Sequence, residues 1–174
     1  MAHRLFEFLS ERSKDHLAPD GNEEIVDVWL SDTDQALDPS IKELLQCSAP
    51  PGLVILSLEN VDDSAPALQT RVASADYLVT LLEQVDRGEL GKNIAELLQA
   101  ASLPRQRRDK NYDLRPLVEA LGLLPADATG SVRLTMRLAA REGATGRPEE
   151  VLDALGIPFE NTRIERTHLV LKGD

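Results

Sequence analysis

The chain has 174 residues, 42% hydrophobic and 3% aromatic, so it is long enough to bury a core built from aliphatic side chains. Cys47 is the only cysteine, which excludes an intramolecular disulfide framework, a cysteine-rich zinc site and an iron–sulfur cluster held by this chain's own thiolates. The net charge of -11 is unevenly divided: residues 1–100 carry 7 Lys and Arg against 19 Asp and Glu, whereas residues 101–174 carry 12 against 11. Any anion site is therefore expected in the later part of the chain.

Residues 1–22 begin with a short helical pattern, Leu5, Phe6 and Leu9, and continue with turn formers that have no apolar period. This composition predicts a loosely ordered lead-in. The first residues are too charged for a signal peptide, and no apolar run approaches the ~20 residues that span a bilayer. We therefore expect a cytoplasmic protein.

The next part of the chain alternates between strand and helix patterns. Residues 23–30 predict a strand with apolar side chains on both faces, and Asp38 and Pro39 open a helix with its apolar positions at helical spacing. In chain order, the expected elements of this half are a strand from 23, a helix over 38–49, a strand over 53–59, a strand over 70–83 and a helix over 92–101.

The second half continues the alternation after Pro104. Its clearest element is the strand over 131–141, which has apolar and basic faces. The others are a short helix over 113–124, a helix over 145–157 and a strand over 162–172.

This order predicts an α+β fold of ferredoxin-like β-α-β repeats, with a mostly antiparallel sheet and helices on one face. We expect one compact domain made of two halves, 23–109 and 110–174.

Basic residues gather between Pro104 and Pro116, and others lie on the two last strands. Guanidinium groups suit phosphate and carboxylate oxygens, and a tyrosine beside them can stack on a ring. The alternatives are a solvated linker, since Asp109 and Asp113 halve the local charge, and strand arginines that pair with carboxylates. The candidates for binding an anion, RNA or a partner are Arg105, Arg107, Arg108, Lys110, Tyr112, Arg115, Arg133, Arg137, Arg166 and His168.

No catalytic or metal-binding pattern stands out. The three histidines, His3, His16 and His168, have no metal-ligand spacing, and no nucleophile stands at a recognisable spacing from a base. The segment EGATGRP, residues 142–148, lacks the Lys-Ser/Thr of a phosphate-binding loop and is interpreted as a turn. We predict no metal, no cofactor and no catalytic residue.

Several segments together resemble the radical SAM-linked protein family: EEIVDVWL, LPRQRRDKNYDLRPLVEAL, GRPEEVLDALGI and RIERTHLVL, within residues 19–172. The basic segment coincides with the family's signature at Lys110, Asp113, Arg115 and Pro116. Members usually carry Ser-His-Leu-Asp and Gln-Gly-Phe-Asn-Pro-His-Pro stretches near the N-terminus; here only FLSERSKDHL stands in that region. The resemblance implies a bacterial accessory protein of a radical SAM enzyme, with RNA- or ribosome-related work, and supplies no catalytic residues.

Three functions remain open. The first is an accessory module that binds RNA or a partner for a radical SAM enzyme. The second is a protein–protein adaptor, which internal pairing of residues 105–115 with carboxylates would favour. The third is an enzyme for a small anionic substrate, with Arg133, Arg137 and Arg166 as the clamp, which requires His168 inside a pocket.

Overall fold

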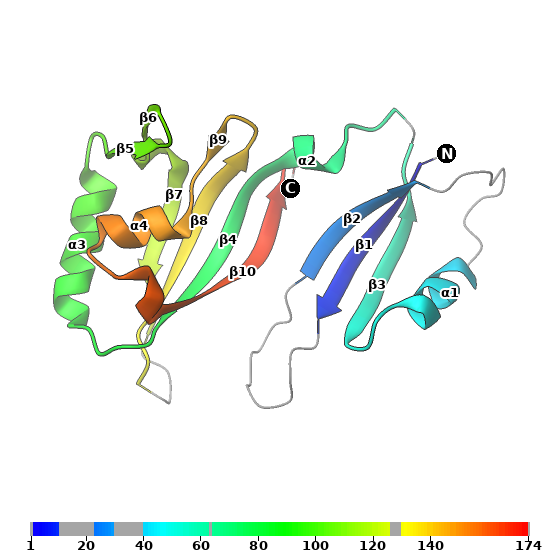
Figure 1. Cartoon of the computed structure of the whole chain (residues 1–174), viewed down its shortest axis with the longest axis horizontal. Coiled ribbons are helices and arrows are strands. Elements are labelled where there is room, and N and C mark those ends of the chain that lie inside the picture. Colours follow the sequence, from blue (N-terminus) through cyan, green and yellow to red (C-terminus); the bar gives the residue numbers. More distant parts are fainter. Residues whose placement is uncertain (1, 11–22, 30–39, 63, 126–129, 174) are drawn as a thin grey trace. The chain divides into compact units, whose positions relative to one another are not determined.

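The computed structural model describes residues 2–10, 23–29, 40–62, 64–125 and 130–173. The chain divides into two compact units, Met1–Arg71 and Val72–Asp174 (Figure 1). The boundary that the sequence predicted between residues 109 and 110 falls inside the second unit, in the turn between two short paired strands. No helix in the described ranges is long and apolar enough to cross a membrane.

The first unit is built on a three-stranded antiparallel sheet in the order β2-β1-β3. The predicted helical pattern at the N-terminus is wrong: Ala2–Ser10 is the central strand, because its backbone hydrogen-bonds to a strand on each side and this pairing overrides a weak local helix preference. Residues 11–22 of the predicted lead-in lie outside the described residues. The elements are β1 (Ala2–Ser10), β2 (Glu23–Trp29), α1 (Ser40–Ser48), β3 (Leu53–Asn60) and α2 (Leu68–Arg71).

Polar side chains of α1 attach this helix to β3. Gln46 donates from Nε2 to the carbonyl oxygen of Leu53 at 2.8 Å and accepts from the backbone N–H of Ile55 at 2.7 Å. Lys42 donates from Nζ to the carbonyl oxygen of Leu56 at 2.5 Å. Because α1 has no fully buried side chain, these hydrogen bonds are a large part of its attachment.

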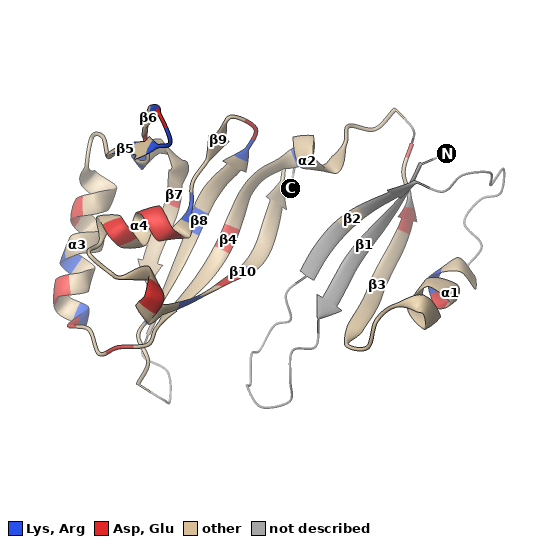
Figure 2. Ribbon diagram, viewed as in Figure 1, with Lys and Arg blue, Asp and Glu red and all other residues tan. Residues whose placement is uncertain are grey.

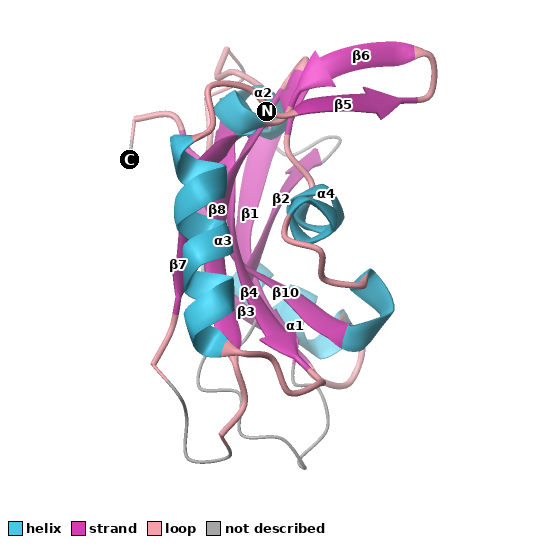
Figure 3. Cartoon of the chain, turned by 90° about the vertical axis from the view of Figure 1, so that its left-hand side faces the viewer, coloured by secondary structure: helices cyan, strands magenta, loops and turns pink. Residues whose placement is uncertain are grey.

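The second unit contains a four-stranded antiparallel path in the order β10-β4-β8-β7, to which the short strand β9 is added beside β8. Strands β5 and β6 form a separate hairpin (Figures 1 and 3). The elements are β4 (Val72–Leu81), α3 (Arg87–Gln99), β5 (Pro104–Arg107), β6 (Lys110–Asp113), η1 (Arg115–Leu117), β7 (Val118–Leu123), β8 (Arg133–Arg141), β9 (Ala144–Thr145), α4 (Pro148–Ala154), η2 (Phe159–Asn161) and β10 (Thr162–Leu171).

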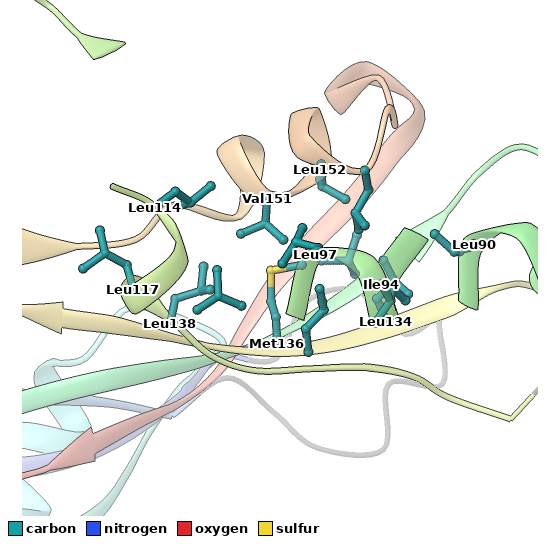
Figure 4. Close-up of a cluster of buried hydrophobic side chains, with 14 of the residues drawn as sticks. Leu90, Ile94, Leu97, Leu114, Leu117, Leu134, Met136, Leu138, Val151 and Leu152 are labelled. Carbon is teal, nitrogen blue, oxygen red and sulfur yellow. The ribbon is translucent and has the colours of Figure 1, made fainter. Parts of the chain in front are cut away.

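The core of the second unit lies between the sheet and the helices α3 and α4. Alternate residues of β8 are buried, and both helices contribute side chains to the same cluster (Figure 4). The cluster includes Leu90, Ile94 and Leu97 of α3, Leu134, Met136 and Leu138 of β8, and Val151 and Leu152 of α4. The structure confirms the α+β class with an antiparallel sheet; the likeness to ferredoxin-like repeats stays a prediction.

The helix predicted over 113–124 is wrong, since only the 3-10 turn η1 is helical and Val118–Leu123 is an edge strand paired with β8. The register shifts between Val118 and Ala120, so Val118 and Leu121 are both buried although they lie three residues apart. A bulge of this kind imitates helical spacing in the sequence. Strands β4, β8 and β10 and helices α3 and α4 overlap their predicted ranges, whereas β5, β6, β9 and η2 were not predicted.

Candidate functional site

The basic segment that follows α3 is the hairpin β5–β6, closed by a two-residue turn at Arg108 and Asp109. Arg107 and Lys110 are paired across the hairpin at the base of this turn. Arg108 has a φ of 55°, and no other non-glycine residue in the described chain has a positive φ. Left-handed backbone at a residue with a long side chain costs on the order of 1 kcal/mol and is often found at functional sites.

Arg107 fixes the hairpin to the start of α4. Its guanidinium donates to both carboxylate oxygens of Glu150, at 2.8 Å and 2.7 Å from one nitrogen, and also to the carbonyl oxygen of Thr145 at 3.2 Å. The same guanidinium lies 4.9 Å from the centre of the Tyr112 ring and donates to its hydroxyl at 3.3 Å. Arg107 and Tyr112 therefore hold the hairpin in place and are largely occupied by that role.

The ionisation of this cluster follows from the same contacts. The hydrogen bond with Glu150 raises the pKa of Arg107. Burial acts to raise the pKa of Glu150, but the hydrogen bonds from Arg107 and Tyr112 act in the opposite direction and the pKa is lowered overall. Burial, followed by the contact with Glu150, raises the pKa of Tyr112. At neutral pH the cluster is a charged pair beside a neutral phenol.

A pocket of about 800 Å³ lies beside this cluster, between the hairpin and the segment that joins β8 to α4. Its exposed cations are Arg108, Lys110 and Arg147. Of its two lining carboxylates, Asp109 and Asp113, the second accepts hydrogen bonds from the backbone N–H groups of Leu103 and Arg115, which lower its pKa. The lining is Arg107, Arg108, Asp109, Lys110, Tyr112, Asp113, Leu117, Gly143, Ala144, Thr145 and Arg147. We call it the hairpin pocket.

Cations and carboxylates are unevenly placed around the hairpin pocket. Figure 2 shows Lys and Arg at the β5–β6 hairpin and Asp and Glu on α4. Of the two lining carboxylates, Asp113 accepts from backbone N–H groups, and Asp109 is the one for which no hydrogen bond is observed; the neighbouring Glu150, outside the lining, is paired with Arg107. The exposed rim therefore favours an anion.

Two predicted site residues of the basic segment, Arg105 and Arg115, make contacts within the fold. Arg115 donates to the carbonyl oxygens of Leu98, at 2.8 Å and 3.1 Å, and of Val118 at 2.8 Å, so it ties the end of α3 to β7. Arg105 lies 3.5 Å from Asp153 and donates to the carbonyl oxygen of Pro104. Neither arginine lines the hairpin pocket.

The predicted residues on strands lie elsewhere, on the sheet. Arg133, Arg137 and His168 lie on the face opposite to α3 and α4, whereas Arg166 pairs with Tyr77 on the face that these helices cover. Arg137 and Asp76 face each other across β8 and β4 and form a bidentate pair with both distances 2.7 Å, whose hydrogen bond lowers the pKa of Asp76. His168, on β10, is exposed and lies opposite Asp76 of β4 in the strand pairing. Arg133 and Arg166 also lie on the sheet strands β8 and β10, away from the hairpin pocket.

The exposed position of His168 removes support for the enzyme hypothesis, which required this side chain inside a pocket. Within the described ranges, no group of three His, Cys, Asp or Glu side chains is placed to hold a metal ion.

Sequence reasoning missed Arg147, Gly143 and Thr145 as neighbours of the basic segment. They belong to the EGATGRP segment, about forty residues further along the chain, and the pairing of β8 with β9 brings that segment to the hairpin. The sequence does show an arginine and two glycines in this segment, which could have marked it as an anion-binding loop. No local pattern, however, links it to the basic segment.

Comparison with known proteins gives one match. The family model described as "Uncharacterized protein conserved in bacteria (DUF2344)" matches residues 17–148. The chain belongs to this family. The match to DUF2344 includes the whole β5–β6 hairpin and Arg147, and therefore all residues that line the hairpin pocket. No curated protein and no solved structure matches the chain significantly.

Proposed function

We propose that this DUF2344 protein is an accessory module that binds RNA phosphates in the hairpin pocket and assists a radical SAM enzyme. The observation that carries the proposal is the clustering of Arg108, Lys110 and Arg147 around one pocket, with Arg108 held in a left-handed conformation at the tip of the hairpin. Guanidinium and ammonium groups are the donors that phosphate oxygens prefer.

The charge of the whole chain sets the expected strength of this binding. A protein of net charge -11 repels RNA at long range, so the local cations must act within a few ångströms of the phosphates. We therefore expect weak binding that falls steeply with salt, in proportion to the few phosphates neutralised.

The enzyme partner is proposed from the resemblance to radical SAM-linked proteins. These 174 residues contain a single cysteine, so the thiolates that hold the enzyme's iron–sulfur cluster must be supplied by residues other than these. Co-purification of the tagged chain with a radical SAM protein from a bacterium that encodes both is the direct test of this partnership.

Fluorescence anisotropy with labelled tRNA and a short single-stranded RNA, at about 50 and 200 mM salt, tests the RNA proposal. Arg108→Gly removes one cation and relieves the left-handed strain, so this variant is expected to be as stable as the wild type, or more stable by up to about 1 kcal/mol, while RNA binding weakens. Lys110→Glu is expected to weaken binding further, since it reverses a charge on the pocket rim.

The matched control is Lys92→Glu, which makes the same charge change at an exposed position of α3 outside the hairpin pocket. If Lys92→Glu and Lys110→Glu weaken binding equally, the effect is one of net charge and the hairpin pocket is not the site. Arg107 is unsuitable for this test, because its loss would release Glu150 and disturb the hairpin itself.

A protein–protein adaptor is the second candidate, and one observation favours it. Arg105, Arg107 and Arg115 are engaged by Asp153, Glu150 and backbone carbonyls, so much of the basic segment is structural. Absence of RNA binding even at low salt, together with co-purification of a radical SAM protein, would select the adaptor.

A further inference from the structure

A second pocket lies at the end of the second unit's sheet where β4 ends and β10 begins. Two large apolar side chains beside it are exposed to water, Leu82 by 64% and Phe159 by 52%. The chain segments that carry them meet, because the backbone N–H of Leu82 donates to the carbonyl oxygen of Asn161 at 2.9 Å, and Phe159 and Asn161 belong to the same 3-10 turn, η2. Among the described residues of this unit, no other large apolar side chain is exposed. Neighbouring exposed side chains of this size are typical of a binding surface.

The pocket has a volume of about 280 Å³ and a wall of mixed apolar and polar residues. This volume is just below the range of about 300–1,000 Å³ that is usual for small-molecule sites, so the pocket suits one or two inserted side chains. Its lining comprises the apolar or small residues Leu81, Val85, Leu90, Leu155, Gly156, Ile157 and Pro158 and the polar residues Glu83, Asp86, Glu89, Asn93 and Asn161.

Carboxylates surround this opening. Glu83, Asp86 and Glu89 line the pocket and are exposed, and Glu160 follows Phe159 directly. Hydrogen bonds from the backbone N–H groups of Glu89 and Gly88 lower the pKa of Asp86, so it is charged at neutral pH.

The lining contains no Lys or Arg. Arg87 and Lys92 are the nearest cations along the chain and neither lines the pocket; Arg87 donates to the carbonyl oxygen of Leu124. We call the site the acidic pocket.

We propose that the acidic pocket docks a segment of a partner protein that presents one or two large apolar side chains flanked by Lys or Arg. Charge complementarity favours such a segment, since apolar anchors fill the pocket and the cations meet the surrounding carboxylates. A second copy of this chain is disfavoured, because its net charge is -11 and its own acidic pocket would be repelled. The inference is independent of RNA binding in the hairpin pocket.

The probe is a fluorescein-labelled synthetic peptide with leucine and phenylalanine placed between lysines, and the comparison peptide has serine at the apolar positions. The full chain, labelled with ¹⁵N, is titrated with each peptide. The first peptide is expected to shift the backbone signals of Leu82, Gly88, Gly156 and Asn161, which lie in or beside the acidic pocket. Equal binding of both peptides, no binding, or shifts confined to residues outside the acidic pocket would overturn the proposal.

Two sets of variants then test the residues. Leu82→Gln combined with Phe159→Gln is expected to weaken the peptide's affinity at least about tenfold, because the peptide's apolar side chains lose their contacts with both of these exposed residues. The matched control is Leu44→Gln, at a leucine of the first unit that is 65% exposed.

Glu83→Lys reverses a charge in the acidic pocket and is expected to weaken binding of the peptide. The matched control is Glu43→Lys, at an exposed position of α1, which is expected to leave binding unchanged. If the controls have the same effect as the pocket variants, the acidic pocket is not the docking site.

Discussion

Glu150 shows how one side chain fixes the position of a whole hairpin. Arg107 and Glu150 are 29% and 21% exposed and are joined by hydrogen bonds of 3.0, 2.8 and 2.7 Å. Hydrogen bonds between charged groups that are partly shielded from water contribute about 1.5–3 kcal/mol. The pair therefore stabilises the attachment of the β5–β6 hairpin to α4. This attachment holds the hairpin beside residues 143–147, which form the other wall of the hairpin pocket.

At the residue scale we predict a pH-dependent effect of Glu150→Gln. The pKa of Glu150 is lower in the folded protein than its ordinary value of 4.5, so the unfolded chain binds more protons in acid. The stabilising contribution is therefore complete above that value and is lost as the pH falls below it. Urea unfolding is expected to show the variant less stable by about 1–2 kcal/mol at pH 7, and this difference is expected to shrink progressively as the pH falls below 4.5.

Glu149→Gln is the control for this prediction, since it makes the same change at the exposed neighbour in the same helical turn. An equal loss of stability in the two variants, or a Glu150→Gln effect that does not depend on pH, would show that the pair with Arg107 contributes nothing specific.

At the scale of elements, α3 depends on contacts at both of its ends. Asp86 accepts hydrogen bonds from the backbone N–H groups of Gly88, at 2.7 Å, and Glu89, at 3.0 Å, and so caps the first turn. Arg115 donates to the carbonyl oxygen of Leu98 near the other end. The helix presents Leu90, Ile94 and Leu97 to the core between these two contacts, so its position matters for the whole sheet.

We predict that Asp86→Ala lowers the free energy of unfolding by about 1 kcal/mol, because two backbone N–H groups lose their acceptor. Asp86→Ser keeps a capping oxygen and is expected to recover most of this loss. Chemical denaturation of both variants at pH 7 makes the comparison. If Asp86→Ser is as destabilised as Asp86→Ala, the effect comes from the lost charge and not from the cap.

At the scale of the whole molecule, the two units differ in charge and in core. The first carries 5 Lys and Arg against 14 Asp and Glu, whereas the second carries 14 against 16. Every residue of the main buried cluster belongs to the second unit, from Val79 to Leu155, and so does every residue that lines the two pockets described above.

This division predicts that a fragment of residues 72–174 folds alone and, if the hairpin pocket binds RNA, binds it more tightly than the full chain at low salt. The reason is that removal of the first unit leaves the core intact and takes away most of the net negative charge. Circular dichroism and cooperative thermal unfolding test the folding, and anisotropy tests the binding. An unfolded fragment, or weaker binding by a folded one, would contradict the prediction.

The α+β class, the basic segment and the five longest helices and strands of the second unit could be predicted from the sequence, because hydrophobic periodicity and helix caps are local properties. Strand β8 alternates cleanly between Leu134, Met136 and Leu138 on the buried side and exposed polar residues on the other. Two predicted helices failed because strand pairing is not a local property. Ala2–Ser10 is a central strand paired on both sides, and the bulge after Val118 gives the buried residues of an edge strand the spacing of a helix.

The residue types at the candidate sites were determined by the sequence, but their grouping was decided by the tertiary structure. Arg107, Arg108 and Lys110 are near one another in the chain, yet only folding shows that the first binds Glu150 while the other two line a pocket with Arg147. Likewise, the segments that carry Leu82 and Phe159 meet only where β4 pairs with β10 and Leu82 hydrogen-bonds to Asn161. Side chains far apart in sequence meet through backbone pairing, and a local pattern carries no information about such partners.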